Sequence, residues 1–276
     1  MLPSWRDRVC FALTPDALSW VRVARGFKPA VVEKNTVSCV AEANGAPWQG
    51  ALQKLQGVLA TQAAADAMVV LSNHFVRYVL VPWSDALNGA DEELAFARHC
   101  FAKVYGDAAA DWEVRLSDGK PGAPRVASAV DRQLVESLRS AFEQSDLALR
   151  SVQPFLMISF NRWRGEFRQR DAWFFIIAER GRYCCAAIEK QEWRNVRSGK
   201  LGDGFLHELP QLFKRELFLA GTGESTRAVM LHAPEQPRFA AVPDSDWQVT
   251  PLVLPPCAGF SPISDPQYAM AMSALS

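Results

Sequence analysis

The side chains that most often bind metals in proteins are few in this chain and lie far apart. None of the four histidines has a second one at ligand spacing, and the six cysteines form no C-x-x-C pair. Cys184 and Cys185 are adjacent in a strand-like run, where neighbouring side chains point to opposite faces and do not share one metal ion. We therefore expect no metal site. We interpret all ten of these side chains as packed in the core or lying on the surface: His74, His99, His207, His232, Cys10, Cys39, Cys100, Cys184, Cys185 and Cys257.

Motifs for phosphate binding and nucleophilic catalysis are incomplete. Gly221-Thr222-Gly223 lacks the spacing and the lysine of a phosphate-binding loop, so we interpret it as the turn that ends a helix. Ser72, Ser84 and Ser159 stand in none of the sequence contexts that expose a nucleophilic serine. Residue types and spacing therefore predict no catalytic, cofactor-binding or metal-binding residue.

Arginines alternate with aromatic residues from Arg162 to Arg170, as they do in some RNA-binding segments. The whole chain has 30 basic and 30 acidic residues, which removes the basic excess expected of a nucleic-acid-binding protein. We favour a solvated helix end followed by a loop, and we expect no nucleic-acid partner. An RNA-associated protein remains a third hypothesis, and it predicts binding that salt weakens steeply.

Apolar runs in the chain are short. None approaches the ~18 residues that cross a bilayer, and residues 1–8 contain no apolar stretch of the kind that a secretory signal needs. The cysteines show no regular disulfide framework. We therefore expect a cytoplasmic protein without a membrane span.

A repeated order of elements is the main organisational signal. The first half predicts three strands, a helix and a fourth strand, at residues 9–13, 18–23, 30–40, about 47–62 and 68–71. The second half repeats this order at residues 173–178, 183–189, 193–196, 205–219 and 227–231. We expect the second helix to begin or kink at Pro210, because proline cannot continue a helical hydrogen-bond ladder.

This layout is that of the duplicated, ribonuclease-H-like α/β fold of actin-like ATPases, with two lobes and an insertion in the first. We place the first lobe in residues 1–153, with the inserted subdomain at about 91–130, and the second lobe in residues 154–276. A helix near residues 155–163 follows the last strand of the first lobe. Residues 266–276 predict a final helix that packs back on the first lobe.

Three segments resemble the actin-like cytoplasmic proteins of type IV pilus and type II secretion assembly, the PilM and GspL families. Residues 11–23 resemble the GspL-type opening hairpin, with Ser19-Trp20 at the entry to its second strand. Residues 135–160 are similar to the helix–strand–helix that ends the first PilM lobe, and residues 265–272 to the final helix. The resemblance implies a protein that binds a tail or domain of an inner-membrane component and lies at that membrane through its partner. It leaves homo-oligomerisation open.

The resemblance also allows the nucleotide elements of actin-like ATPases to be compared. In the first hairpin turn Pro15 removes an amide donor, and Asp16 reads as an Asx-type turn residue. In the second, the family's Asp-x-Gly pattern falls on Ala178-Glu179-Arg180, so alanine replaces the acid and arginine replaces the glycine. The Gly-Gly that contacts adenosine in the family is replaced by His232-Ala233-Pro234.

We therefore expect a non-catalytic scaffold, a pseudo-ATPase without a cofactor. The alternative is an enzyme, a divergent ATPase or kinase of the same fold. In that hypothesis Arg180 or Arg182 binds phosphate in place of the glycine amides, since arginine can bind phosphate with two hydrogen bonds.

Overall fold

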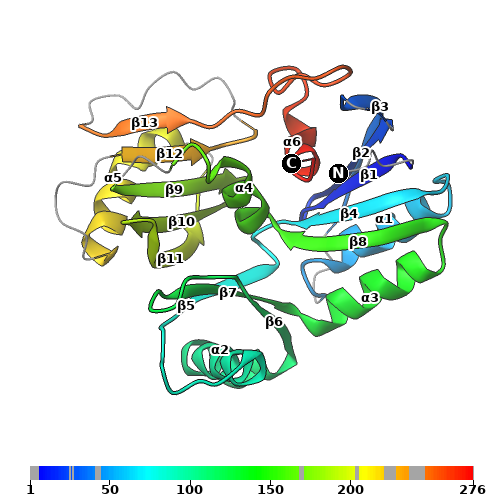
Figure 1. Ribbon diagram of the computed structural model, residues 1–276. Helices are drawn as coiled ribbons and strands as arrows, with labels where there is room; N and C mark the ends of the chain where they lie inside the picture. Colours follow the sequence, from blue (N-terminus) through cyan, green and yellow to red (C-terminus); the bar gives the residue numbers. More distant parts are fainter. Residues whose placement is uncertain are drawn as a thin grey trace.

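Three β-sheets with helices against their faces make up the molecule (Figure 1). The computed structural model describes residues 6–24, 26, 28–40, 45–167, 171–202, 205–220, 228–235 and 246–275. Two sheets have five strands, and a third has three antiparallel strands. In Figure 1 the two larger sheets stand side by side and the small sheet lies below them.

The first sheet has the strand order β3-β2-β1-β4-β8. Its central strand, β1, is an apolar run buried on both faces, as a central strand must be, whereas the edge strand β3 is largely exposed. β2 and β3 run antiparallel in the hairpin order, and β4 and β8 run parallel to β1. The strands are β1 (Arg8–Leu13), β2 (Ala17–Ala24), β3 (Ala30–Ser38), β4 (Ala65–Leu71) and β8 (Leu147–Pro154).

Helices cover both faces of the first sheet (Figure 1). α1 (Gln49–Leu59) and α3 (Arg132–Glu143) lie together on one face, and α3 begins where the Asp131 side chain accepts a hydrogen bond from the Gln133 amide at 2.8 Å. On the other face, the turn η2 (Pro266–Tyr268) and helix α6 (Ala269–Met272) pack against β1, β2 and β4. The last helix thus covers the sheet with which the chain begins.

The second sheet repeats the first, with the order β11-β10-β9-β12-β13. Side chains of β9 alternate between its faces: Phe174 and Ile176 pack under helix α5, while Phe175 packs against Phe160 of helix α4 at 5.7 Å between ring centroids. The expected duplicated α/β organisation is confirmed. The elements are β9 (Ala172–Glu179), β10 (Arg182–Glu189), β11 (Glu192–Lys200), β12 (Ala228–His232), β13 (Gln248–Pro251), α4 (Phe155–Trp163) and α5 (Phe205–Ala220).

The length of β11 needs correction, and of the two alternatives for Pro210 a helix start at that residue is excluded. β11 extends to Lys200 rather than ending at residue 196, because β10 pairs with it over its whole length. Helix α5 begins at Phe205, and Pro210 lies inside it. The helix tolerates the lost hydrogen bond because Leu209, Leu212 and Phe213 on either side of the proline are buried against the sheet.

The third sheet is the insertion, with the order β5-β7-β6. Helix α2 (Ala90–Tyr105) packs on it and continues into the 3-10 turn η1 (Gly106–Asp111). β5 pairs with β7 and so belongs to this sheet, although it precedes the expected start at residue 91. The strands are β5 (Val76–Val81), β6 (Trp112–Leu116) and β7 (Arg125–Asp131).

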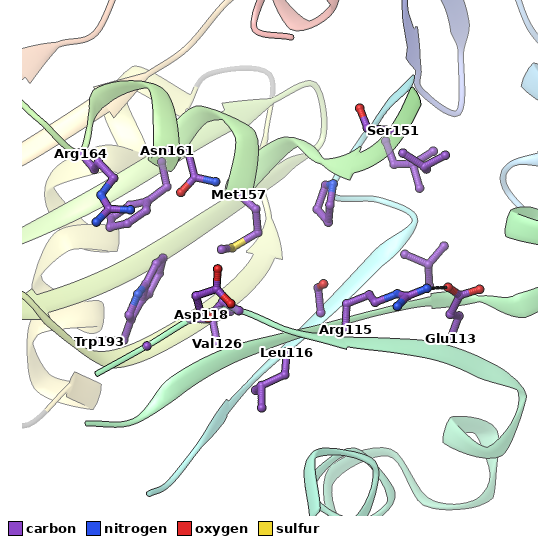
Figure 2. A pocket seen from close by; sticks show the side chains of 18 of the residues that line it. Glu113, Arg115, Leu116, Asp118, Val126, Ser151, Met157, Asn161, Arg164 and Trp193 are labelled. Carbon is purple, nitrogen blue, oxygen red and sulfur yellow. Dashed lines mark hydrogen bonds and ion pairs between the residues drawn. The ribbon is translucent and has the colours of Figure 1, made fainter. Parts of the chain in front are cut away.

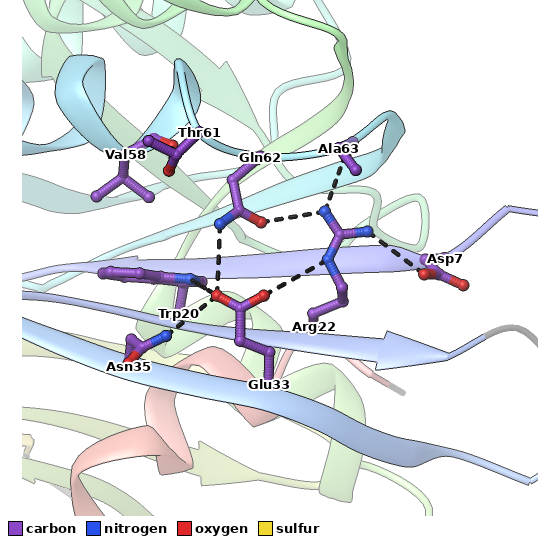
Figure 3. A network of polar contacts seen from close by, with 9 residues as sticks. All are labelled: Asp7, Trp20, Arg22, Glu33, Asn35, Val58, Thr61, Gln62 and Ala63. Atoms are coloured by element: carbon purple, nitrogen blue, oxygen red, sulfur yellow. Dashed lines mark hydrogen bonds and ion pairs between the residues drawn. The ribbon is translucent and has the colours of Figure 1, made fainter.

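A buried arginine on β2 forms polar contacts with β3 and with the loop before β4 (Figure 3). Arg22 on β2 is 9% exposed; it donates hydrogen bonds to the Ala63 carbonyl at 2.8 Å and to Gln62 Oε1 at 3.1 Å. Its Nε lies 3.8 Å from Glu33 Oε2 on β3. Because a buried charge without partners is costly, this network holds β2, β3 and the start of β4 in one arrangement.

Candidate functional site

The β1–β2 turn of the first sheet and the β9–β10 turn of the second sheet lie next to each other. Arg180 follows β9, and its Nη1 lies 3.1 Å from Asp16 Oδ2 in the β1–β2 turn, while its Nε lies 3.5 Å from Glu235 Oε2. The Arg180 carbonyl accepts a hydrogen bond from His74 Nε2 at 2.9 Å. The chain's own charges therefore bridge the two turns in which an actin-like ATPase would hold phosphate.

The β1–β2 turn uses its polar groups internally. The Thr14 hydroxyl donates to Asp16 Oδ1 at 2.7 Å and accepts from the Ala17 amide at 3.0 Å, and the Thr14 amide donates to the Ala17 carbonyl at 3.0 Å. Pro15 has no amide hydrogen. Two amides of the turn are thus occupied and a third is absent, which leaves little backbone to bind an anion.

Glu179, the last residue of β9, places a buried carboxylate between the lobes. Its Oε2 accepts from Ser72 Oγ at 2.5 Å, and its Oε1 accepts from the Asn73 amide at 3.0 Å and from Asn73 Nδ2 at 2.5 Å. Asn73 Oδ1 in turn accepts from the Tyr78 hydroxyl at 2.6 Å and from the Leu156 amide at 3.2 Å. These contacts reach from the second sheet to the residues after β4.

The sequence reasoning missed Glu179. The sequence comparison placed Ala178 at the position of the aspartate in the Asp-x-Gly pattern of actin-like ATPases. Ala178 lies in the core under α5, and the carboxylate that faces the first lobe belongs to the next residue. Burial raises the pKa of Glu179 to about 7, although hydrogen bonds from Ser72 and Asn73 oppose the shift. The available signal was a charged residue directly after six apolar residues of a strand, 173–178.

A cavity of about 390 Å³ remains beside the bridged turns. Five of its lining residues carry a hydroxyl group, and the C-terminal segment contributes Gln267 and Met270 to the wall. Burial lowers the pKa of His74, which favours the neutral ring at this position. The hydroxyl-bearing side chains are Thr14, Ser19, Thr36, Ser38 and Ser72.

The two alternative phosphate ligands differ in their contacts, since the buried Arg182 Nε has no hydrogen-bond partner among the described residues. The Arg180 guanidinium lies between two carboxylates, as described above. Arg182 Nη1 donates to Ser198 Oγ of β11 at 3.5 Å. Among the described residues, no group of three His, Cys, Asp or Glu side chains could hold a metal ion.

A much larger groove, of about 1760 Å³, lies between the small sheet, β8, α3 and α4 (Figure 2). Figure 2 shows Arg115 and Glu113 from β6 on one wall; opposite them are Met157 and Asn161 from α4 and Arg164 directly after that helix. Trp193 stands at one end. The volume of the groove exceeds the roughly 300–1,000 Å³ of a small-molecule pocket and suits a segment of polypeptide.

The charges of this groove are unevenly paired. Arg115 and Arg139 both contact the same atom, Glu113 Oε1, at 2.7 and 3.1 Å. Partial burial acts to raise the pKa of Glu113, but hydrogen bonds from the two arginines hold it below its usual value. Two guanidinium groups therefore share one carboxylate in this wall.

The other residues that the sequence singled out do not meet at one site. His99 on α2 and His207 on α5 are exposed, whereas Ser159 on α4 is buried. His232 is buried and donates through Nδ1 to the Leu252 carbonyl at 2.8 Å, and burial lowers its pKa to about 4. Residues 221–223 and 168–170 lie outside the described residues.

No protein-family model and no curated protein sequence matches the chain, but solved structures do. The PilM–PilN type IV pilus biogenesis complex matches with a TM-score of 0.65 over 96% of each chain, at 14% identity. A Bacteroides thetaiotaomicron protein with an actin-like ATPase fold and unknown function matches with a TM-score of 0.53 at 8% identity, over 83% of this chain and 82% of that one. The chain has the actin-like ATPase fold. The cytoplasmic domain of EpsL, an inner-membrane component of the Vibrio cholerae type II secretion system, matches with a TM-score of 0.60 at 9% identity, over 98% of this chain and 94% of that one.

In this actin-like fold the cleft between the hairpin turns is bridged by side chains, while the groove beside the inserted sheet is open. At such low identities the likeness establishes the fold, and it does not transfer the partners of PilM or EpsL to this chain. Among the described residues, no helix is both long and apolar enough to cross a membrane.

Proposed function

We propose that this chain is a non-catalytic assembly scaffold on the cytoplasmic face of the inner membrane. It binds a segment of a membrane component of a type IV pilus or type II secretion-like system. The observation that carries this proposal is the contrast between the two cavities: the chain's own side chains bridge the cleft, and the larger groove stays open.

Two of the solved structures that this chain resembles support the proposal. One is a PilM–PilN complex of type IV pilus biogenesis, and the other is the cytoplasmic domain of an inner-membrane secretion component. An actin-like body that is joined to a membrane protein needs a binding surface. The groove supplies such a surface, because it combines apolar walls with arginines that can fix the register of a bound segment.

The groove is tested by a substitution that fills it. Ser128 on β7 lines the groove and is half-buried, so Ser128→Trp would occupy its floor. Ser140→Trp, at an exposed position of α3 outside the groove, is the matched control. We expect the wild-type chain and Ser140→Trp to co-purify from detergent extracts with a membrane protein encoded beside this chain, and Ser128→Trp to lose it.

A cross-linker placed in the groove separates specific capture from adventitious capture. A photoreactive amino acid in place of Asn161, which lines the groove on α4, should form an adduct with the same membrane protein. The proposal is wrong if no neighbouring membrane protein associates with the chain, or if Ser128→Trp binds it as well as the wild type does.

A further inference from the structure

One wall of the cavity of about 390 Å³ carries three hydroxyl groups on one face of the first sheet. Ser19 on β2 and Thr36 on β3 are opposite each other in the strand pairing, and Ser38 follows two residues later on β3. Side chains two residues apart on a strand share a face, and so do directly opposite cross-strand neighbours. Among the described residues, none of these three hydroxyls has a hydrogen-bond partner.

Ser19 is the most enclosed of the three. The residue is 6% exposed and lines the cavity. Buried hydroxyl groups in proteins are nearly always hydrogen-bonded, because burying one without a partner is costly. A polar molecule inside the cavity would give Ser19 the partner that the described part of the chain does not supply.

The charges around the cavity favour a cation. Three carboxyl groups line it, from Asp16, Glu179 and Glu235, against the single guanidinium of Arg180. That guanidinium already lies between Asp16 and Glu235. His74 adds no charge, because burial lowers its pKa and favours the neutral ring. The cavity therefore has an acidic excess, which repels phosphate and attracts a positively charged group.

The size and lining of the cavity favour a compact, saturated molecule. Its volume falls within the roughly 300–1,000 Å³ of small-molecule pockets. Among the described residues that line it there is no Phe, Tyr or Trp, so it offers no such ring for stacking with a flat base.

We propose that this cavity binds a small organic cation that carries hydroxyl groups, such as an amino sugar or an amino alcohol. The ammonium group of the ligand lies against Glu179, and its hydroxyl groups bond to Ser19, Thr36 and Ser38. The three hydrogen bonds from Ser72 and Asn73 leave one of the roughly four acceptor positions of the Glu179 carboxylate for the ammonium group. The cavity lies apart from the groove, so this inference does not rest on the proposed function.

Binding of a cation should release a proton from Glu179. The pKa of this buried carboxyl group is raised to about 7, and a nearby positive charge favours the ionised form and lowers the pKa. Arg182 on β10 is the cation of the chain that already acts on Glu179 in this direction. The neighbouring Tyr78 and Cys184 stay neutral, because burial raises the pKa of each well above its usual value. Glu179 is thus the source of the released proton.

Calorimetry with matched ligands tests the choice of a cation. Glucosamine is compared with its neutral and anionic counterparts, glucose and glucuronate, and the amino alcohol serinol is compared with glycerol. At least one amine should bind roughly tenfold more tightly than its neutral counterpart, because hydrogen bonds to charged groups are the stronger ones. Glucuronate should not bind. A pH indicator in weakly buffered solution at about pH 6.5, where most of Glu179 is protonated, should record proton release as the amine binds.

Two substitutions locate the binding. Glu179→Gln keeps the contacts to Ser72 and Asn73, and it should abolish the proton release and weaken amine binding roughly tenfold. Ser19→Ala should weaken amine binding roughly fivefold, the worth of one hydrogen bond, and should leave the proton release upon saturation intact. Ser140→Ala, at an exposed position of α3 outside the cavity, is the control and should bind like the wild type.

Four results would overturn the inference. The first is that neither amine binds, and the second is that each neutral counterpart binds as tightly as its amine. The third is preferred binding of glucuronate, which would mean that Arg180 selects an anion. The fourth is amine binding that neither Glu179→Gln nor Ser19→Ala weakens, which would place the ligand elsewhere on the protein. All are measured on the purified chain, so they are independent of the co-purification result.

Discussion

At the scale of single residues, Glu179 is a carboxylate buried between the lobes. Its carboxylate is 7% exposed and is surrounded by Ser72 and Asn73 from the opposite lobe. Burial disfavours the charged form, which is why the pKa of Glu179 rises to about 7. Near neutral pH, part of the population therefore carries a proton between the lobes.

Glu179→Gln should change how stability depends on pH. The folded state keeps its proton up to about pH 7, whereas the unfolded chain loses it near the ordinary pKa of 4.5. The wild-type free energy of unfolding should therefore fall as pH rises from 4.5 to 7, by about 3 kcal/mol relative to Glu179→Gln. Glutamine keeps the contacts, because its amide can donate to Ser72 and its carbonyl can accept from Asn73.

Urea unfolding of both proteins at several pH values measures this difference. Glu136→Gln, at an exposed position of α3, is the control and should leave the pH dependence of the wild type intact. Parallel curves for the wild type and Glu179→Gln across this range would show that Glu179 ionises normally in the folded protein.

At the scale of elements, two glycines differ in what a side chain would meet. Gly199 on β11 pairs with Tyr183 on β10, and a Cβ there would overlap the tyrosine ring. The Tyr183 hydroxyl donates to the buried Glu216 at 2.9 Å, so a displaced ring would leave that carboxylate without this partner. Gly57 lies inside α1, and a Cβ there meets nothing within 4 Å.

The two alanine substitutions should therefore have opposite signs. Gly199→Ala should destabilise by about 1–3 kcal/mol through overpacking, whereas Gly57→Ala should stabilise by up to about 1 kcal/mol through helix propensity. Thermal unfolding of the two variants beside the wild type measures both effects. Equal shifts in the same direction would contradict the packing of Tyr183 on Gly199.

The sequence predicted those elements that depend on neighbouring residues, and it predicted less well the contacts between residues far apart in the chain. Turn residues and apolar alternation predicted the repeated strands and the opposite faces of Cys184 and Cys185, which lie in separate cores. The full length of β11 was missed because a polar edge strand is defined by its partner β10. The buried contact between Glu179 and Ser72 joins residues 107 positions apart, and no local pattern carries such information.

At the scale of the whole molecule, contacts between the chain's own residues join the lobes beside the cavity of about 390 Å³. Glu179 provides the buried contact, and Arg180 adds an exposed one to Asp16 with a side chain that is 70% exposed. Lys34 on β3 also reaches the C-terminal segment, where its Nζ lies 2.7 Å from Asp265 Oδ1. The lobes are therefore joined by direct side-chain contacts.

Calorimetry with magnesium-ATP should give no binding heat for the wild type. Arg180→Ala should also give none and should lower the free energy of unfolding by no more than about 1 kcal/mol, because exposed ion pairs contribute little. Clear micromolar binding by the wild type that Arg180→Ala removes would instead support the divergent ATPase, with Arg180 as its phosphate ligand.

The position of α6 also has a consequence for biosynthesis. One face of β1, β2 and β4 is covered by residues 266–272, although those strands lie within the first 71 residues. At ~5–20 residues per second, a ribosome needs roughly ten to forty seconds to reach α6 after completing β4. During that interval the apolar face stays uncovered on the nascent chain, and it is the surface a chaperone would be expected to bind.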